Sequence, residues 1–284
     1  MAAPLPICYL NGRLLPLGEA RISPFDRSFL FGDGVYEVIA ARRGQARRLE
    51  SNLARLARSL HELRIRDPHT PAQWRHIVGQ MISANGGGDI YLYLQVSRGA
   101  EVGRNHAPLP DIEPTVFGFC SPLPAPSADT LTNGVACITA ADTRWARCDI
   151  KSVALLANVL LRQQAVEAHA SETILLRDGL LTEASASSVY VISGGRICTP
   201  ANSNQLLPGT TRSLVEELAD GHGIPRRVDD VTEVELRCAD EVWLSAATRG
   251  VVAVTSIDGR PVNSGKPGPL WRRMHELVEA FWLS

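Results

Sequence analysis

A proline-rich segment, Ser121–Ser127, interrupts the helix and strand patterns of this 284-residue chain. It holds three prolines within five residues. Proline fixes φ and lacks a backbone N–H, so such a run opposes both a helix and a central strand and stiffens the chain. We therefore expect a linker at residues 121–127, between a smaller N-terminal α/β domain at residues 1–120 and a larger C-terminal domain at residues 128–284.

The composition is that of a globular protein with a small-molecule partner. Hydrophobic residues make up 45% of the chain, and 29 basic residues balance 30 acidic ones. This balance, without any block of like charge, argues against a nucleic-acid surface or an anionic membrane surface. No apolar run reaches the roughly 20 residues of a membrane span, no signal peptide is recognised, and the cysteines lack C-x-x-C spacing. We expect a cytoplasmic protein without a metal site.

Turn signals and alternating residues predict the strands. Asn11-Gly12, Asp178-Gly179 and Asp258-Gly259 each lie between short apolar runs, which is typical of β-hairpins with tight turns. Apolar and polar residues alternate over Ile90–Ser97, which predicts a strand with one buried face.

Apolar residues at helical spacing predict five helices. The first contains Leu53 and Leu63, with a cap at Glu50–Asn52, and it carries Arg55 away from its apolar stripe, as is typical of a solvated face. The others are expected from Pro71 to a stop at Asn85, over residues 155–169, through Leu214 and Leu218 to a stop at Gly221, and around Trp271.

Lys151 is one of only two lysines, and the remaining basic residues are arginines. It stands at the mouth of an apolar helical pattern. A desolvated amine can lose its proton and attack a carbonyl, which a guanidinium cannot do. The alternative is a lysine that snorkels from a helix start. From this stretch alone, the two interpretations remain equally open.

Three other groups suit a phosphorylated, ring-bearing ligand, and each also has a simpler explanation. Glu183 precedes a run of small residues and could pair with a cationic ring nitrogen, or it could be a capping or surface residue. Gly209–Thr211 opens a helix and suits a phosphate, or it is an ordinary N-cap. Arg104 and His106 follow a strand and suit a carboxylate, or they are exposed loop charges.

Together these features resemble the class IV (fold type IV) pyridoxal-phosphate aminotransferases, and within them the D-amino-acid aminotransferases. The resemblance covers nearly the whole chain and rests on Asp26-Arg27 with Phe31–Val38, on Arg144–Ser152 and on Thr182–Ser187. It implies a two-domain enzyme of mixed α/β class, whose larger domain has a β-barrel-like core flanked by helices. It also implies pyridoxal 5'-phosphate as the cofactor.

The resemblance further implies roles for individual residues. Lys151 would form the Schiff base (internal aldimine) with the cofactor and then move the proton between substrate and cofactor. Glu183 matches the acid that keeps the pyridine nitrogen protonated. The other implied cofactor contacts, most of them around the phosphate, are Arg55, Ser187, Leu207, Gly209, Thr210, Thr211 and Ala247.

The substrate assignment rests on Tyr36, Arg104 and His106, which match the α-carboxylate trap of D-selective members. In that group the loop with Arg104 and His106 reaches in from the other subunit of a homodimer. The implied reaction is ping-pong transfer from a D-amino acid of the D-alanine type to a 2-oxo acid such as 2-oxoglutarate. Branched-chain L-aminotransferase and aminodeoxychorismate lyase share the fold and remain alternatives. A non-catalytic binding protein is another, against which the retained Lys151 and Glu183 argue.

The chain departs from the family pattern at four positions. Ser188 stands where asparagine is common, and Ala246 and Ala247 stand where threonines near the phosphate are common. Arg249 is also unexpected, and it suits either a dicarboxylate substrate or the surface.

Overall fold

The computed structural model describes residues 3–283. Contacts within the chain divide it into two compact units. The first contains the described residues up to Pro124 together with Ile150–Leu155, and the second contains Ala125–Asp149 together with the described residues from Leu156 onward. The short segment that carries Lys151 thus belongs by its contacts to the first unit, although it follows the proline-rich segment in the sequence.

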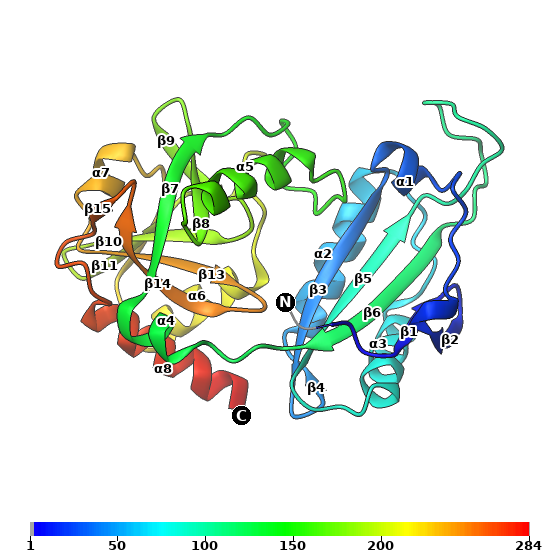
Figure 1. The fold of residues 1–284 in the computed structure, drawn as a ribbon, viewed down its shortest axis with the longest axis horizontal. Coiled ribbons are helices and arrows are strands. Elements are labelled where there is room, and N and C mark those ends of the chain that lie inside the picture. The colour runs from blue at the N-terminus through cyan, green and yellow to red at the C-terminus, as the bar shows by residue number, and fades with distance from the viewer. Residues whose placement is uncertain (1–2, 284) are drawn as a thin grey trace. The chain divides into compact units, whose positions relative to one another are not determined.

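An antiparallel six-stranded sheet is the frame of the first unit (Figure 1). The strand order is β2-β1-β6-β5-β3-β4. Its strands are β1 (Ile7–Leu10), β2 (Arg13–Pro16), β3 (Gly34–Arg42), β4 (Gln45–Ala46), β5 (Ile90–Ser97) and β6 (Thr115–Pro122). The hairpin predicted at Asn11-Gly12 is confirmed, since β1 pairs with β2 across it and both turn residues have positive φ. The strand predicted over Ile90–Ser97 is β5, which alternates between buried and half-buried residues along most of its length.

The helical elements of the first unit are η1 (Leu17–Glu19, a 3₁₀ turn), α1 (Arg27–Phe31), α2 (Leu49–Glu62) and α3 (Pro71–Ala84). Helices α2 and α3 pack on the sheet through their apolar sides. The predicted start of α3 is confirmed, because Thr70 and Gln73 form a capping box. The predicted cap of α2 is wrong: Arg48, in the left-handed conformation and without a side-chain cap, precedes Leu49. The turn after β4 therefore sets this helix start, and Leu56 and Leu60 still join the core with the sheet.

The irregular connection in the proline-rich segment is shorter than expected, because its first two residues still belong to a strand. Ser121 and Pro122 belong to β6 and pair with β5. Pro122 ends the strand, which is where a central strand tolerates a residue without an N–H. Within residues 3–283, no helix combines the length and the apolar character needed to cross a bilayer.

A nine-stranded mixed sheet forms the centre of the second unit (Figure 1). Eight strands follow the order β12-β11-β10-β13-β14-β7-β8-β9, and β15 pairs with β14. The strands are β7 (Val135–Ala141), β8 (Glu172–Arg177), β9 (Leu180–Ala184), β10 (Ser188–Ser193), β11 (Arg196–Thr199), β12 (Arg226–Val228), β13 (Glu241–Ala246), β14 (Gly250–Ile257) and β15 (Arg260–Pro261). The hairpins predicted at Asp178-Gly179 and Asp258-Gly259 are confirmed, with positive φ at all of these turn residues.

Successive residues of the central strands belong to two different hydrophobic cores. Val189 and Val191 of β10 pack with residues of β8 and β9, whereas Tyr190 and Ile192 pack with residues of helices. Because strand side chains alternate between faces, both faces of the sheet are buried. The sheet curls into a half-barrel, in agreement with the barrel-like core that was expected.

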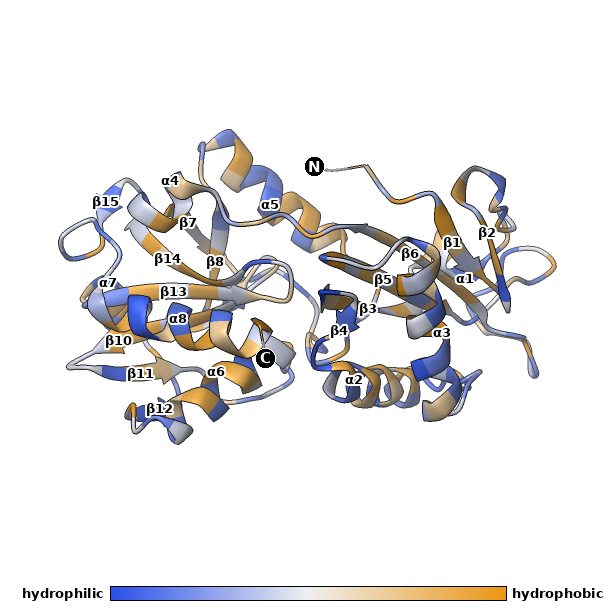
Figure 2. Cartoon of the chain, turned by 90° about the horizontal axis from the view of Figure 1, so that it is seen from below, coloured by the Kyte–Doolittle hydropathy of each residue, from blue (hydrophilic) through white to orange (hydrophobic). Residues whose placement is uncertain are grey.

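The helices of the second unit are α4 (Ala128–Asn133), α5 (Leu156–Glu167), α6 (Thr210–Gly221), α7 (Glu233–Arg237) and α8 (Pro269–Leu283). Helices α6 and α8 cover one face of the sheet through Leu214, Val215 and Trp271. Figure 2 shows that β13 and β14 are mainly hydrophobic, whereas α8 carries both hydrophobic and hydrophilic residues. The pattern is that of a helix with one side on the core. The helices predicted over residues 155–169, through Leu214 to Gly221 and around Trp271 are thereby confirmed, with shifts at their ends.

Candidate functional site

Lys151 lies in an extended segment of the first unit. Its carbonyl oxygen accepts a hydrogen bond from the Tyr36 N–H at 2.9 Å, and Ser152 forms an isolated β-bridge with Val35. Helix α5 begins only at Leu156. The expectation that Lys151 stands at a helix start is therefore wrong, because backbone pairing with the beginning of β3 holds the segment extended.

Gly32 permits this attachment. A Cβ on Gly32 would lie 3.1 Å from the Ala154 Cβ, and the φ of Gly32 is +68°. The carbonyl of Gly34 accepts a hydrogen bond from the Val153 N–H at 3.0 Å, whereas a Cβ on Gly34 would lie 2.9 Å from the Val96 carbonyl oxygen of β5. Gly32 thus allows the close packing of the lysine segment, and Gly34 allows the close packing of β3 on β5.

The Lys151 amine faces the ring of Tyr36, with Nζ 4.3 Å from the ring centroid. Tyr36 in turn stacks on Tyr93, with centroids 5.5 Å apart. Among the described residues of the first unit, no carboxylate forms an ion pair with Lys151. The structure therefore brings two of the predicted site residues together and places the amine over an aromatic ring, in the geometry of a cation–π contact.

Arg55 is buried and paired with Glu37. Its Nε and Nη2 donate to the two carboxylate oxygens of Glu37, each at 2.8 Å, and Arg55 and Glu37 are 8% and 0% exposed. The expected solvated position of Arg55 is wrong, because β3 places a buried acid beside α2. The cofactor role of Arg55 stays a prediction.

Arg104 and His106 lie together over one aromatic ring. The Arg104 guanidinium carbon is 5.0 Å from the centroid of the Phe31 ring, and the His106 ring is 5.3 Å from the same ring. Both residues are exposed. Among the described residues of the first unit, no carboxylate is paired with Arg104 in an ion pair, so its guanidinium could donate hydrogen bonds to an anion.

In the second unit, the Glu183 carboxylate lies between a guanidinium and a backbone donor. Arg144 Nη1 contacts Glu183 Oε1, and the Leu207 N–H donates to Glu183 Oε2 at 3.2 Å. Arg144 also binds Asp142 through Nε and Nη2, at 2.9 and 2.8 Å. Glu183 and Leu207, both predicted site residues, are thus in direct contact, and a fixed positive charge supports the acid.

The charges of this cluster shift the pKa values of its members. Burial alone would raise the pKa of Asp142, but hydrogen bonds and the charge of Arg144 hold it below its usual value. Burial alone would lower the pKa of Arg144, but Asp142 and Glu183 raise it above its usual value. Asp142 and Arg144 are therefore both charged at neutral pH, and the Arg144 guanidinium contacts the Glu183 carboxylate as a fixed cation.

Gly209 is the N-cap of α6 and makes no side-chain cap hydrogen bond. A Cβ at this position would lie 2.8 Å from Ser188 Oγ. Glycine therefore allows Ser188 to lie close to the start of α6. Thr210 and Thr211, the first residues of α6, are 8% and 5% exposed. This end of a three-turn helix offers N–H groups and a positive dipole, a combination that fits a phosphate.

The other predicted cofactor contacts lie in connections between strands. The Ser187 hydroxyl donates to the buried Glu172 carboxylate at 3.1 Å, and the Ser185 hydroxyl contacts the same carboxylate. Glu172 therefore shapes the turn after Glu183. Ala247 is half-buried in the connection between β13 and β14.

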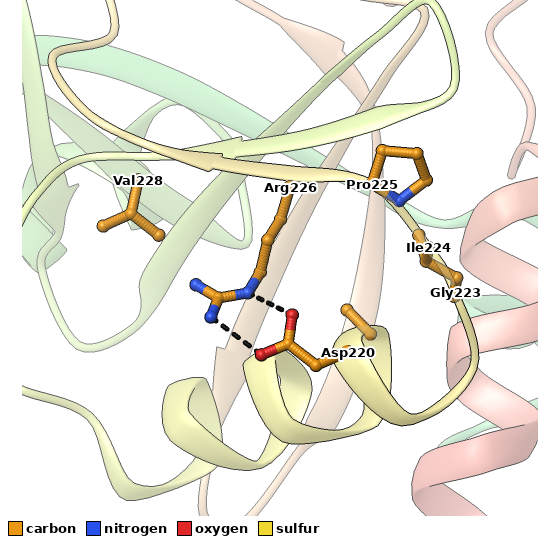
Figure 3. A pocket seen from close by; sticks show the side chains of 7 residues that line it. Asp220, Gly223, Ile224, Pro225, Arg226 and Val228 are labelled. Atoms are coloured by element: carbon orange, nitrogen blue, oxygen red, sulfur yellow. Dashed lines mark hydrogen bonds and ion pairs between the residues drawn. The ribbon is translucent and has the colours of Figure 1, made fainter.

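A separate hollow of about 530 Å³ lies at the end of α6 (Figure 3). Asp220 and Arg226 line it and bind each other through two hydrogen bonds of 2.7 and 2.8 Å. It contains none of the predicted site residues, and its charges neutralise each other, so we do not assign the function to it.

Sequence reasoning left Arg144, Asp142 and Glu37 without roles, although Arg144 belonged to a recognised motif. Charged residues within otherwise apolar or small-residue stretches were the available signal. Their partners could not be inferred, because Arg144 and Glu183 are 39 residues apart in the sequence.

The donor groups fit pyridoxal phosphate chemically. Lys151 supplies a primary amine, Glu183 supplies a carboxylate held by Arg144, and Gly209–Thr211 supplies a helix start with N–H groups and hydroxyls. Lys151 belongs to the first unit and the other two belong to the second, so the geometry of each set is defined within its own unit.

Comparisons with known proteins agree with this chemistry. The family model of amino-transferase class IV matches residues 34–257. The D-alanine aminotransferase of Bacillus licheniformis is 40% identical over 274 residues, or 96% of each chain, and that of Staphylococcus aureus (strain MSSA476) is 36% identical with the same coverage.

Solved structures agree in fold. The T.th. branched-chain amino acid aminotransferase with pyridoxamine 5'-phosphate has a TM-score of 0.91 and 26% identity, covering 98% of this chain and 94% of its own. The fold IV transaminase CpuTA1 from Curtobacterium pusillum has a TM-score of 0.82 and 25% identity, covering 96% and 93%. The fold type IV architecture is thereby confirmed.

Proposed function

The chain belongs to the class IV aminotransferases, and we propose that it transfers the amino group of a D-amino acid to a 2-oxo acid, using pyridoxal 5'-phosphate. The observation that carries this proposal is the 40% identity to a D-alanine aminotransferase over 96% of both chains. The ion pair between Arg144 and Glu183 and the arginine–histidine pair at Phe31 support it.

Bound pyridoxal phosphate supplies a carbonyl that condenses with amines and a protonated ring that withdraws electrons. Lys151 would hold the cofactor covalently through Nζ and, once released, would move a proton at the substrate Cα. Glu183, supported by Arg144, would hold the proton on the ring nitrogen.

The remaining predicted residues would bind the cofactor phosphate or position the ring. Gly209–Thr211 would bind the phosphate with backbone N–H groups and hydroxyls, and Arg55 would add positive charge while Glu37 orients it. Leu207 would pack under the ring. Ser187 and Ala247 would line the same side of the cofactor, with Ser187 oriented by Glu172.

Tyr36, Arg104 and His106 would bind the substrate α-carboxylate. A fixed carboxylate determines which Cα substituent faces Lys151, and therefore which enantiomer reacts. The stacking of Arg104 and His106 on Phe31 supports a paired role.

We also propose a homodimer in which Arg104 and His106 serve the partner's site. On α5, Leu156, Val159 and Leu160 are 72%, 59% and 58% exposed. Their spacing puts them on one face of the helix, and a contiguous apolar stripe in water favours coverage by a partner.

The described cysteines are free, which suits a reducing compartment and the proposed cytoplasmic location.

The test is a half-reaction panel of D- and L-amino acids with the purified holoenzyme, monitored by its visible spectrum. We expect D-alanine to react faster than L-leucine or L-valine, and 2-oxoglutarate to restore the spectrum. The branched-chain neighbour makes L-selective transamination the second candidate, and faster turnover of L-leucine would establish it. A protein that stays colourless with added pyridoxal phosphate would instead support a non-catalytic binding role.

A further inference from the structure

Arg27 is buried at the start of α1, yet its guanidinium reaches the exposed loop that carries Arg104 and His106. Nη1 donates to the Asn105 carbonyl oxygen at 2.7 Å, and Nη2 donates to the His106 carbonyl oxygen at 2.9 Å. Two successive carbonyl groups of the loop are therefore bound to one fixed cation.

Two carboxylates hold that cation in place. Arg27 Nε donates to Asp33 Oδ2 at 2.8 Å, and Nη1 also donates to Glu101 Oε2 at 3.2 Å. Glu101 Oε1 accepts a hydrogen bond from the Leu109 N–H at 2.8 Å, so the same acid binds the far end of the loop. Arg27 and Glu101 together connect both ends of residues 101–109 to α1.

The base of the loop is attached through the backbone as well. The Arg27 N–H donates to the Gly99 carbonyl oxygen at 2.8 Å, and Asp26 forms a β-bridge with Ala100. A Cβ on Gly99 would lie 2.0 Å from the Glu113 carbonyl oxygen, and the φ of Gly99 is +115°. This position therefore requires glycine, and the loop leaves the sheet in one direction.

The side chains of the loop converge on Phe31, whose ring also lies 4.8 Å from the Arg27 guanidinium carbon. Arg27 thus fixes the backbone of residues 105 and 106 and also contacts the ring on which Arg104 and His106 rest. A lysine could not replace Arg27. Its single ammonium nitrogen cannot bind two carboxylates and two carbonyl groups that contact three different nitrogens of the guanidinium.

We propose that Arg27 is a positioning residue that presents Arg104 and His106 as a preformed carboxylate-binding pair. The proposal rests on the proposed function. Its consequence is selective: loss of Arg27 weakens recognition of the substrate carboxylate and leaves the reactivity of the cofactor toward simple amines unchanged. Preorganisation of an otherwise exposed loop lowers the ordering cost of binding.

The test compares D-alanine with ethylamine, which is the same amine without the carboxylate, in half-reactions of the holoenzyme followed spectroscopically. We expect Arg27→Lys to raise the D-alanine concentration for half-maximal rate about 10- to 100-fold, the loss that corresponds to hydrogen bonds with a charged group. The ethylamine rate constant should stay within about twofold of wild type. Equal loss with both amines, or no loss with D-alanine, would overturn the proposal.

Arg98→Lys is the matched control. Arg98 binds the same Asp33 carboxylate at 2.8 Å, but its other donors bind the carbonyl groups of Leu63 and Arg64 rather than the loop. This variant should keep the wild-type preference for D-alanine over ethylamine. A shift as large as that of Arg27→Lys would show that the charge network, and not the contact with the loop, is responsible.

Hydrogen exchange of the purified full chain gives an independent measurement. Residues 102–108 should exchange faster in Arg27→Lys than in wild type, whereas Arg98→Lys should leave this segment unchanged. Unchanged exchange in Arg27→Lys would also overturn the proposal.

If Arg27→Lys does not fold, Glu101→Gln removes the anion from Arg27 and retains an acceptor for Leu109, and a smaller shift in both measurements is expected. A wild-type protein that does not react with D-alanine would refute the proposed function, while hydrogen exchange would still decide whether Arg27 orders the loop.

Discussion

Arg144 joins two buried acids: its Nη2 donates to Asp142 Oδ2 at 2.8 Å, while its Nη1 contacts the Glu183 carboxylate. The positive charge of Arg144 therefore lies directly against the Glu183 carboxylate. A carboxylate that is to bind a protonated ring nitrogen has to remain ionised, so Arg144 and Glu183 act as one unit.

Replacement of Arg144 by glutamine should therefore weaken both the fold and the cofactor site. The change leaves two buried acids without their shared cation, and breaking a buried ion pair costs about 3–5 kcal/mol. We expect a lower free energy of unfolding in denaturant, weaker binding of pyridoxal phosphate in a spectral titration, and a lower kcat.

Arg177→Gln is the matched control for that change, because Arg177 pairs with Asp142 at 3.1 Å. It should lower stability without altering the cofactor spectrum. Equal cofactor affinity in the Arg144 and Arg177 variants would show that Arg144 does not support Glu183.

Lys151→Arg tests the role of the amine. The guanidinium retains the positive charge but cannot form an imine, so the variant should fold and lose transamination by several orders of magnitude. Circular dichroism should match wild type, and the visible band of the bound cofactor should be absent. Substantial activity in Lys151→Arg would assign the chemistry to another residue.

The Glu37–Arg55 pair should contribute to stability because it is buried. Glu37→Gln leaves the Arg55 charge without its counter-ion, at a cost of about 3–5 kcal/mol in the free energy of unfolding. The exposed pair Glu50–Arg75 has the same two-bond geometry, and Glu50→Gln should change stability very little because solvent screens that pair. Similar losses in both variants would contradict the importance of burial.

Asp33 should make stability depend on pH in the acid range. Burial alone would raise its pKa, but hydrogen bonds and the charges of Arg98 and Arg27 hold the pKa below 3.8. As the pH falls, Asp33 therefore takes up a proton in the unfolded chain at a higher pH than in the folded chain. Its contribution to the free energy of unfolding is complete above about pH 5 and declines as the pH falls below the pKa of Asp33 in the unfolded chain.

Asp33→Asn removes this contribution. Its deficit in unfolding free energy, relative to wild type, should be constant between about pH 5 and pH 7 and should narrow below about pH 4. Denaturant titrations at several pH values measure it. A deficit that widens in acid would show that the folded-state pKa is raised rather than lowered.

The sequence by itself determined the local elements and the chemistry of the candidate residues. Turns such as Asn11-Gly12, the helix start at Pro71 and the alternation in β5 depend on residues that are close in the chain, so their patterns predict them. The rarity of lysine likewise identified Lys151 from composition and the chemistry of amines.

Only the tertiary structure decided which charges are buried and what they bind. Arg55 lies off the apolar stripe of its helix and was expected in solvent, yet β3 brings Glu37 to it. Arg27 meets the carbonyl of Asn105 across 78 residues of sequence. A buried charge requires partners that local patterns do not specify, because the folded backbone determines which distant groups replace the lost water. The same reason explains Lys151: pairing with β3, and not helix propensity, determines the position of its backbone.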